Sequence, residues 1–200
     1  MSTLEAPLVP KTPRGQRTRQ KLLDAAEEEF GLNGFNQTSV SNITKNAGVG
    51  QGTFYLYFNS KEEILRELVD QLGTKLREAI AEKIAHEVDQ ESIEREGLRA
   101  FLTFVAEHSR FYRVISESQF VDEKIFEDYY MGFGAAYKNR LAKAERHGTI
   151  RPGDSEVRAW ALMGVAQFLG QRFVAWAKPG ESIDHVVDEA ISILKQGFLE

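Results

Sequence analysis

Residues 36–61 have the sequence NQTSVSNITKNAGVGQGTFYLYFNSK, and this stretch decides the fold. Thr38 or Ser39 can cap the start of a short helix, because hydroxyl side chains accept from the free backbone N–H groups there. Gly48-Val49-Gly50 interrupts that helix, and a second one is expected over about Gln51 to Tyr57. Two short helices joined by a tight glycine turn predict a helix-turn-helix, whose second helix enters the DNA major groove.

The distribution of charge supports a surface that meets an anion. The chain has a net charge of −5, yet residues 1–61 hold seven Lys or Arg against five Asp or Glu. Residues 30–61 contain no Asp or Glu, although the chain has 30 among its 200 residues. A phosphate backbone repels carboxylates, so a surface that touches it should lack them. We therefore expect one DNA-facing module attached to an acidic body.

Composition excludes several other classes of site. The chain has no cysteine, which rules out disulfides and thiolate metal sites. No apolar run reaches the roughly 18 residues that a membrane helix needs, and the N-terminus lacks the apolar core of a secretory signal. We expect a cytoplasmic protein without a cofactor or a metal.

The rest of the chain is predicted to be helical, because alternating strand patterns are nearly absent. The fold class is therefore all-α, with about nine helices. Residues 1–13, rich in proline, are expected to form a flexible basic arm, residues 14–59 the helix-turn-helix domain and residues 60–200 a larger helical domain. Ser60 and Glu63 form a capping-box pattern that begins a long helix. The expected helical ranges are 14–32, about 25 residues from 60, 91–107, 109–117, 122–147, 154–177 and 181–199.

These residues resemble the TetR family of bacterial regulators. The matching features are Thr38-Ser39-Val40 with Ile43, Ala47-Gly48-Val49, residues 53–58 with the sequence TFYLYF, and Ser60-Lys61-Glu62. The resemblance covers about residues 15–65, a quarter of the chain. It departs from the family's pattern at Gly50, where a serine is usual, and at Gln51, where Lys, Arg or Pro is common.

The resemblance implies a role for individual residues on DNA. Thr38, Tyr57 and Lys61 are expected at phosphates, whereas Gln51, Thr53 and Tyr55 are the candidates for base edges or nearby sugars. A glutamine amide can pair with the N6 and N7 atoms of adenine, which favours base reading at Gln51. The remaining candidates are the helix cap Ser39 and the small residues Gly50 and Gly52. Arg14, Arg17 and Arg19 are expected at the neighbouring backbone or minor groove, although Arg14 and Arg17 could equally be solvated.

The resemblance also implies that the larger domain binds a small molecule. Aromatic residues at helical spacing are typical of a pocket wall, although the same pattern describes ordinary core packing. A hydrophobic or aromatic ligand is favoured over a highly charged one. The predicted ligand-binding residues are Phe101, Phe104, His108, Phe111, Phe126, Tyr130, Phe133, Tyr137 and Phe168.

Two C-terminal helices are predicted to form a homodimer. The helix near residues 155–177 is apolar over more of its circumference than one buried face needs. The last helix adds a second apolar stripe, which ends at Phe198, and two helices from each subunit can pair as a four-helix bundle. A monomeric core remains the alternative. The predicted dimer residues are Val157, Trp160, Ala161, Gly164, Phe168, Val187, Ile191 and Leu194.

Together these features favour a homodimeric repressor that a ligand releases from a pseudo-palindromic operator in double-stranded DNA. An enzyme is disfavoured, because the chain has no phosphate-binding loop, dinucleotide fingerprint or pair of histidines at metal spacing. A helical ligand-binding protein without a role on DNA, a protein-binding adaptor, and a TetR-like activator or ligand-independent regulator remain the alternatives.

Overall fold

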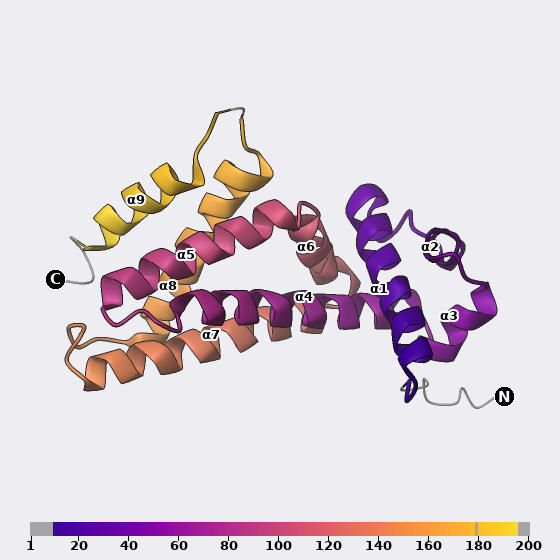
Figure 1. Ribbon diagram of the computed structural model, residues 1–200, viewed down its shortest axis with the longest axis horizontal. Helices are drawn as coiled ribbons and strands as arrows, with labels where there is room; N and C mark the ends of the chain where they lie inside the picture. The colour runs from indigo at the N-terminus through magenta and orange to yellow at the C-terminus, as the bar shows by residue number, and fades with distance from the viewer. Residues whose placement is uncertain (1–9, 179, 196–200) are drawn as a thin grey trace. The chain divides into compact units, whose positions relative to one another are not determined.

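The computed structural model describes residues 10–178 and 180–195, and all its regular elements there are helices (Figure 1). The all-α prediction is confirmed. The α-helices are α1 (Pro13–Asn33), α2 (Val40–Ala47), α3 (Gln51–Tyr57), α4 (Lys61–Ile84), α5 (Gln90–Glu107), α6 (Phe111–Val121), α7 (Glu123–Arg146), α8 (Ser155–Gly170) and α9 (Ile183–Leu194). Most of the proposed N-terminal arm and Phe198 lie outside the described residues.

The helices form two compact units. Unit 1 comprises the described residues through Leu72 together with Arg113–Glu127, and unit 2 comprises Gly73–Tyr112 with the described residues from Asp128 onward. The chain passes from one unit to the other within α4, α6 and α7. The division therefore differs from the predicted boundary at residue 60, because the first half of α4 and most of α6 belong to the unit that contains the helix-turn-helix.

Unit 1 has an aromatic core beneath its short helices. Phe30, Phe54 and Phe58 are fully buried, and the rings of Phe54 and Phe58 lie 5.7 Å apart. Thr12 caps α1 by accepting from the backbone N–H of Gly15, and Pro13 stands at its first position, where no N–H is needed. Gly48 ends α2 with φ of 68° and ψ of 34°, a left-handed conformation that favours glycine. This glycine is the pivot that the sequence predicts.

Ser60 begins α4 in a modified capping box. Its hydroxyl accepts from the backbone N–H of Glu63 at 3.3 Å, as predicted. The carboxylate of Glu63, however, accepts from the N–H of Asn59 at 2.6 Å and not from that of Ser60. The predicted start of α4 is thus correct, whereas the Glu63 carboxylate accepts from a backbone N–H one residue earlier than the capping box predicts.

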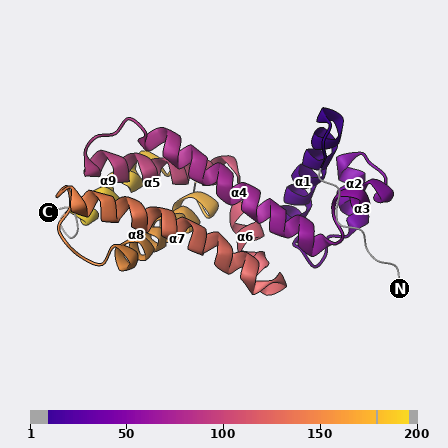
Figure 2. The ribbon, with the colours of Figure 1, turned by 90° about the horizontal axis from the view of Figure 1, so that it is seen from below.

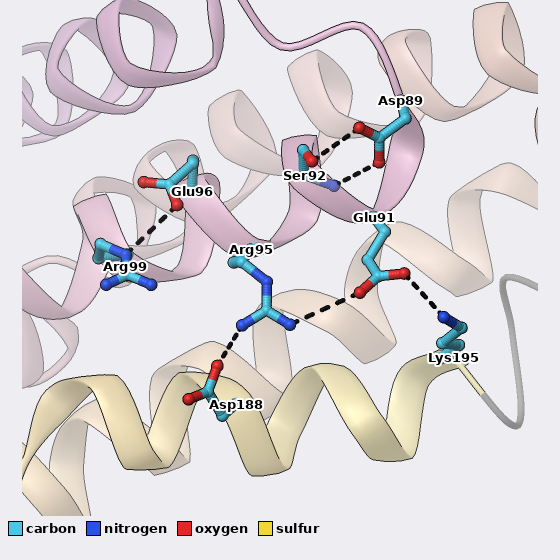
Figure 3. A network of polar contacts seen from close by, with 8 residues as sticks. All are labelled: Asp89, Glu91, Ser92, Arg95, Glu96, Arg99, Asp188 and Lys195. Carbon is cyan, nitrogen blue, oxygen red and sulfur yellow. Dashed lines mark hydrogen bonds and ion pairs between the residues drawn. The ribbon is translucent and has the colours of Figure 1, made fainter.

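Unit 2 packs the second half of α4 with α5, α7, α8 and α9. Helices α5 and α9 lie side by side in both views (Figures 1 and 2). Ion pairs from Arg95 to Asp188 and from Lys195 to Glu91 join them (Figure 3). Arg99 forms a further ion pair with Asp184 of α9. Such exposed pairs each contribute little to stability, so the apolar contacts between the helices dominate.

The helix expected over residues 154–177 is not uniform. Regular α-helix ends at Gly170, and Gln171–Ala175 form a turn of π-helix. A Cβ atom on Gly170 would lie 3.0 Å from the Phe101 ring and closer still to the Tyr112 hydroxyl, so this backbone packs tightly on α5 and the start of α6. No periodicity in the sequence indicates such a change of helix type.

Candidate nucleic-acid interface and ligand pocket

Helix α3 presents an uncharged polar face to solvent. Gln51, Gly52 and Tyr55 are exposed, with Tyr55 at 56%, and Thr53 and Tyr57 are half-buried. The buried Phe54 anchors the opposite side of the helix. This arrangement brings together the residues predicted to approach base edges, because the buried Phe54 fixes which side of this short helix turns outward, although Leu56 is also exposed.

The two glycines of α3 have no structural neighbour that requires a small residue. A Cβ atom on Gly50 or Gly52 would meet nothing within 4 Å. Gly50 caps the helix without a side-chain hydrogen bond, and its carbonyl accepts from the N–H of Thr53 at 2.9 Å. The absence of side chains at Gly50 and Gly52 permits close approach of a sugar-phosphate backbone.

The start of α2 uses its hydroxyl groups within the protein. Ser39 is exposed and accepts from the backbone N–H of Asn42 at 3.1 Å, while the Asn42 side chain accepts from the Ser39 N–H at 2.9 Å. Thr38 is only 2% exposed, and its hydroxyl lies 2.8 Å from the Gly34 carbonyl and 3.1 Å from that of Glu29, to which it donates. These bonds give Thr38 a structural role that the sequence reasoning missed, and its phosphate contact stays a prediction.

Lys61 also has protein partners. Its ammonium group donates to the carbonyls of Phe35 and Thr38 at 2.8 and 2.6 Å, and it lies 4.3 Å from the centre of the Phe35 ring. Lys61, the first residue of α4, therefore stabilises the connection between α1 and α2. A phosphate would have to share this ammonium group with two carbonyls.

The predicted arginines differ in their surroundings. Arg14 and Arg17, at the start of α1, are exposed and so are available to a nucleic acid. Arg19 instead forms an ion pair with Glu67 and lies 4.9 Å from the centre of the Phe58 ring. The suggestion that Arg19 reaches DNA is therefore corrected, because this side chain joins α1 to α4.

A contact between α6 and the end of α1 was not predicted. Arg113 donates to the carbonyl of Leu32 at 2.7 Å, and Glu117 accepts from the backbone N–H of Phe35. Arg113 and Glu117 also pair with each other at 2.9 Å. The only sequence signal is their i, i+4 spacing, which is equally typical of a solvated helix face. We call Arg113 and Glu117 the α6 latch.

Unit 2 contains a cavity of about 370 Å³ between its helices. Four of the predicted ligand-binding residues line it: Phe101, Tyr130, Phe133 and Tyr137. The wall also takes in apolar side chains that periodicity alone could not distinguish from core. They include Leu76, Ile80, Ile84, Leu98, Leu162, Met163 and Leu194.

The other five predicted ligand residues do not line this cavity. Phe104 and Phe111 are buried in the core, and the ring of His108 stacks on Phe104 at 4.2 Å. Phe126 belongs to unit 1, and Phe168 is 76% exposed. The prediction is corrected for these residues, because helical spacing shows that aromatics share a face but not which space that face meets.

A buried polar cluster forms one part of the cavity wall. The Glu94 carboxylate is buried and accepts from Gln90 at 2.6 Å, from Arg140 at 3.3 Å and from the Tyr137 hydroxyl. Burial, with the nearby negative charge of Glu94, raises the pKa of Tyr137 well above its usual value, so this phenol remains a donor at neutral pH. We call Glu94, Gln90, Tyr137 and Arg140 the polar end of the cavity. The sequence reasoning identified only Tyr137.

Helix α8 carries an apolar face that is largely exposed to solvent. Its exposed side chains are Val157, Trp160, Ala161, Val165 and Phe168, with half-buried Gly164 between them. The α9 residues behave differently: Val187 and Ile191 are buried in the subunit core, and Leu194 lines the cavity. The predicted dimer role of these three residues is corrected, because the inner stripe of α9 packs within its own subunit.

Comparison with known proteins agrees with the geometry. Residues 22–68 match the family model described as bacterial regulatory proteins, tetR family. Two Bacillus subtilis proteins, the HTH-type transcriptional regulator YdgC and the fatty acid metabolism regulator protein, are each 45% identical over 64 and 67 residues. These matches cover 32% of this chain, and 33% and 34% of those two proteins.

Likeness of fold extends much further than likeness of sequence. The crystal structure of the transcriptional regulator FadR from Bacillus subtilis, in complex with stearoyl-CoA, matches with a TM-score of 0.78 at 22% identity, covering 89% of this chain and 98% of that one. The fold of that regulator is therefore shared by both units. The predicted resemblance to the TetR family is confirmed over residues 22–68, which match the model of the tetR family of bacterial regulatory proteins.

Proposed function

We propose that this protein is a homodimeric transcriptional regulator that binds a specific DNA sequence in the bacterial cytoplasm. The observation that carries the proposal is the exposed face of α3, formed by Gln51, Gly52 and Tyr55 within a segment that has no acidic residue. Its groups can donate and accept hydrogen bonds without the desolvation cost of a charge, as base edges require.

The exposed face of α8 supports a dimer. An exposed apolar strip on one helix favours burial against another surface, and a two-fold axis lets the same strip cover itself. Two α3 helices in one dimer would read two half-sites about 34 Å apart, which predicts an operator with inverted symmetry. Val157, Trp160 and Phe168 are the proposed centre of this interface.

The cavity supports control by an apolar small molecule. Its volume of about 370 Å³ lies within the usual range for ligand pockets, and most of its wall is apolar. The FadR relative is known with an acyl compound bound, which makes acyl compounds the first ligands to test. A hundredfold loss of operator affinity requires the ligand to prefer the released state by about 2.7 kcal/mol. Burying roughly 110 Å² of apolar ligand surface more in that state would suffice.

Three helices can carry this change between the units. The chain crosses between the two units within α4, α6 and α7, and the α6 latch binds the end of α1. A shift of α6 would therefore act on the connection before α2. The position of the operator relative to the promoter decides whether such binding represses or activates transcription.

Fluorescence anisotropy with the DNA upstream of the protein's own gene tests the proposal. We expect affinity to fall steeply between about 50 and 200 mM salt, because phosphate contacts release counterions. Saturating ligand should weaken the complex about a hundredfold. Binding that ignores both salt and DNA sequence would favour the alternative of a helical ligand-binding protein or adaptor, and turnover of a bound compound would favour an enzyme.

A further inference from the structure

The ligand cavity contains an arginine without a carboxylate partner. Arg77 of α4 lines the cavity, donates to the hydroxyl of Thr74 at 2.9 Å and lies 5.2 Å from the centre of the Phe133 ring. Within the described parts of the chain it forms no ion pair. The contrast with Arg140 in the same cavity is clear, since Arg140 pairs with the buried Glu94. A cation in an apolar wall without a counterion favours an anionic ligand group.

Two glycines make room around this guanidinium group. A Cβ atom on Gly73 of α4 would lie 3.3 Å from its Nη1 atom, and one on Gly132 of α7 would lie 3.6 Å from it. The guanidinium group is therefore held in a narrow position between the two helices. Held there, it loses little further side-chain entropy when an anion binds.

A second donor stands beside Arg77. Tyr129 lines the same cavity, is only 7% exposed and, like Arg77, lies against Gly73. Burial and the neighbouring Tyr130 and Tyr112 raise its pKa well above the usual value, and Arg77 offsets only part of this shift. The phenol therefore keeps its proton at neutral pH. A protonated phenol that lines a cavity beside a guanidinium group can donate a hydrogen bond to the carboxylate of a ligand.

The polar end lies at the opposite end of the cavity from Arg77. Phe133, which faces Arg77, and Arg140, which pairs with Glu94, are seven residues apart on α7, or about 10 Å along the helix axis. Hydrogen bonds within the polar end occupy the Glu94 carboxylate. An apolar tail gains nothing by displacing these bonds, so it should stop before them. At roughly 30 Å³ for each non-hydrogen atom, a cavity of about 370 Å³ holds on the order of a dozen such atoms.

We propose that the cavity binds a medium-chain carboxylate of about ten carbons, with its head group on Arg77 and Tyr129 and its tail directed toward the polar end. This inference rests on the proposed function, since it names the ligand class of the same cavity. It departs from the relative bound to stearoyl-CoA in two respects: the tail is shorter, and the head is a free carboxylate rather than a thioester.

Calorimetric titration of the full chain with decanoate, decan-1-ol, hexadecanoate and decanoyl-CoA tests the inference. Decanol has the same tail as decanoate and no charge. We expect decanoate to bind at least about tenfold more tightly than decanol, since a charge-assisted hydrogen bond contributes about 1.5 kcal/mol or more. Hexadecanoate should bind at least about tenfold more weakly than decanoate, because its tail exceeds the cavity.

Single substitutions test which residues cause the preference for decanoate over decanol. Arg77→Gln should remove the preference for decanoate over decanol while decanol still binds, which also shows that the variant is folded. Tyr129→Phe should reduce the preference by about threefold to tenfold. Lys83→Gln removes an exposed charge from the same helix outside the cavity wall, and it should leave both affinities unchanged.

Other results would overturn the inference. Equal binding of decanoate and decanol would show that Arg77 does not hold the head group. Tighter binding of hexadecanoate, or of decanoyl-CoA with no dependence on Arg77, would show that the chain length or the free carboxylate is wrong. In both cases the proposed function stands if operator binding, measured separately by anisotropy, still responds to a ligand. Loss of operator binding itself, with decanoate bound as expected, would instead contradict the proposed function alone.

Discussion

Lys61 binds the carbonyl of Thr38 at 2.6 Å, across the connection that leads into the helix-turn-helix. The same ammonium group donates to the carbonyl of Phe35 at 2.8 Å, so it binds two backbone carbonyls of this connection. The resemblance to the TetR family assigns Lys61 to a phosphate, whereas the structure gives it an internal role. The two roles predict different results when the charge is removed.

Lys61→Met should lower the free energy of unfolding by about 1.5 kcal/mol, because hydrogen bonds from a charged donor contribute about that amount. The salt dependence of DNA binding should change little. Chemical denaturation and anisotropy over a range of salt concentrations measure the two quantities. Lys45→Met, which removes an exposed lysine from α2, is the control and should leave stability unchanged. Unchanged stability with a salt slope reduced by about one contact would instead support a phosphate role for Lys61.

Gly48→Ala should destabilise the protein by about 1 kcal/mol, because φ of 68° strains any residue with a Cβ atom. Nothing lies within 4 Å of the new methyl group, so the strain is conformational and not a clash. Gly52→Ala is the matched control: it adds a methyl group to open space in a helix and should stabilise by about 0.5 to 1 kcal/mol. Equal effects of the two substitutions on thermal unfolding would contradict the role of Gly48 as the pivot.

Phe168→Asp should convert the dimer into a monomer and abolish tight operator binding, because a carboxylate would be buried in the proposed α8 interface. Light scattering after gel filtration gives the mass. Phe120 is the matched control, since it is 85% exposed compared with 76% for Phe168 and lies on α6. Phe120→Asp should remain a dimer. A monomeric wild-type protein, or dissociation by both variants alike, would refute the proposed interface.

Alkaline pH should weaken unit 2 through its buried tyrosines. Burial raises the pKa values of Tyr112, Tyr129, Tyr130 and Tyr137 above 10. Folding therefore favours the protonated phenols, and their contribution is fully present below pH 10 and is lost as the pH rises through the raised values. Urea unfolding between pH 8 and 11.5 measures the loss. Tyr137→Phe should be less stable than the wild type at pH 8 and should lose less stability above pH 10. Parallel curves for the two proteins would contradict this account.

Helix boundaries were the features that could be predicted best from the sequence, because their causes are local. Ser39 and Ser60 cap where their hydroxyls suggest, and Gly48 adopts the left-handed conformation that the turn needs. Asp154 likewise caps α8 through the N–H groups of Glu156 and Val157. Each of these features depends on residues within four positions along the chain.

Features that depend on partners distant along the chain could not be predicted from the sequence. The stripe of α9 predicted an apolar interface, but Val187 and Ile191 face their own subunit, since periodicity does not identify the opposing surface. Lys61 and Arg19 carry charges that suit DNA, but Lys61 binds the connection between α1 and α2, and Arg19 binds Glu67 of α4. Glu94 and Arg77 lie on charged helix faces and enter the cavity only because of how their helices pack.

Selection of DNA from a random library, followed by sequencing, tests the central claim most directly. The wild-type chain should enrich an inverted repeat, with half-site centres about one helical turn of DNA apart or a multiple of it. The variant Gln51→Ala with Tyr55→Ala should bind DNA weakly and enrich no repeat, while its thermal stability stays close to that of the wild type because both side chains are exposed. Recovery of the same repeat by this variant, or of no symmetric sequence by the wild type, would contradict the assignment of α3 as the helix that recognises DNA.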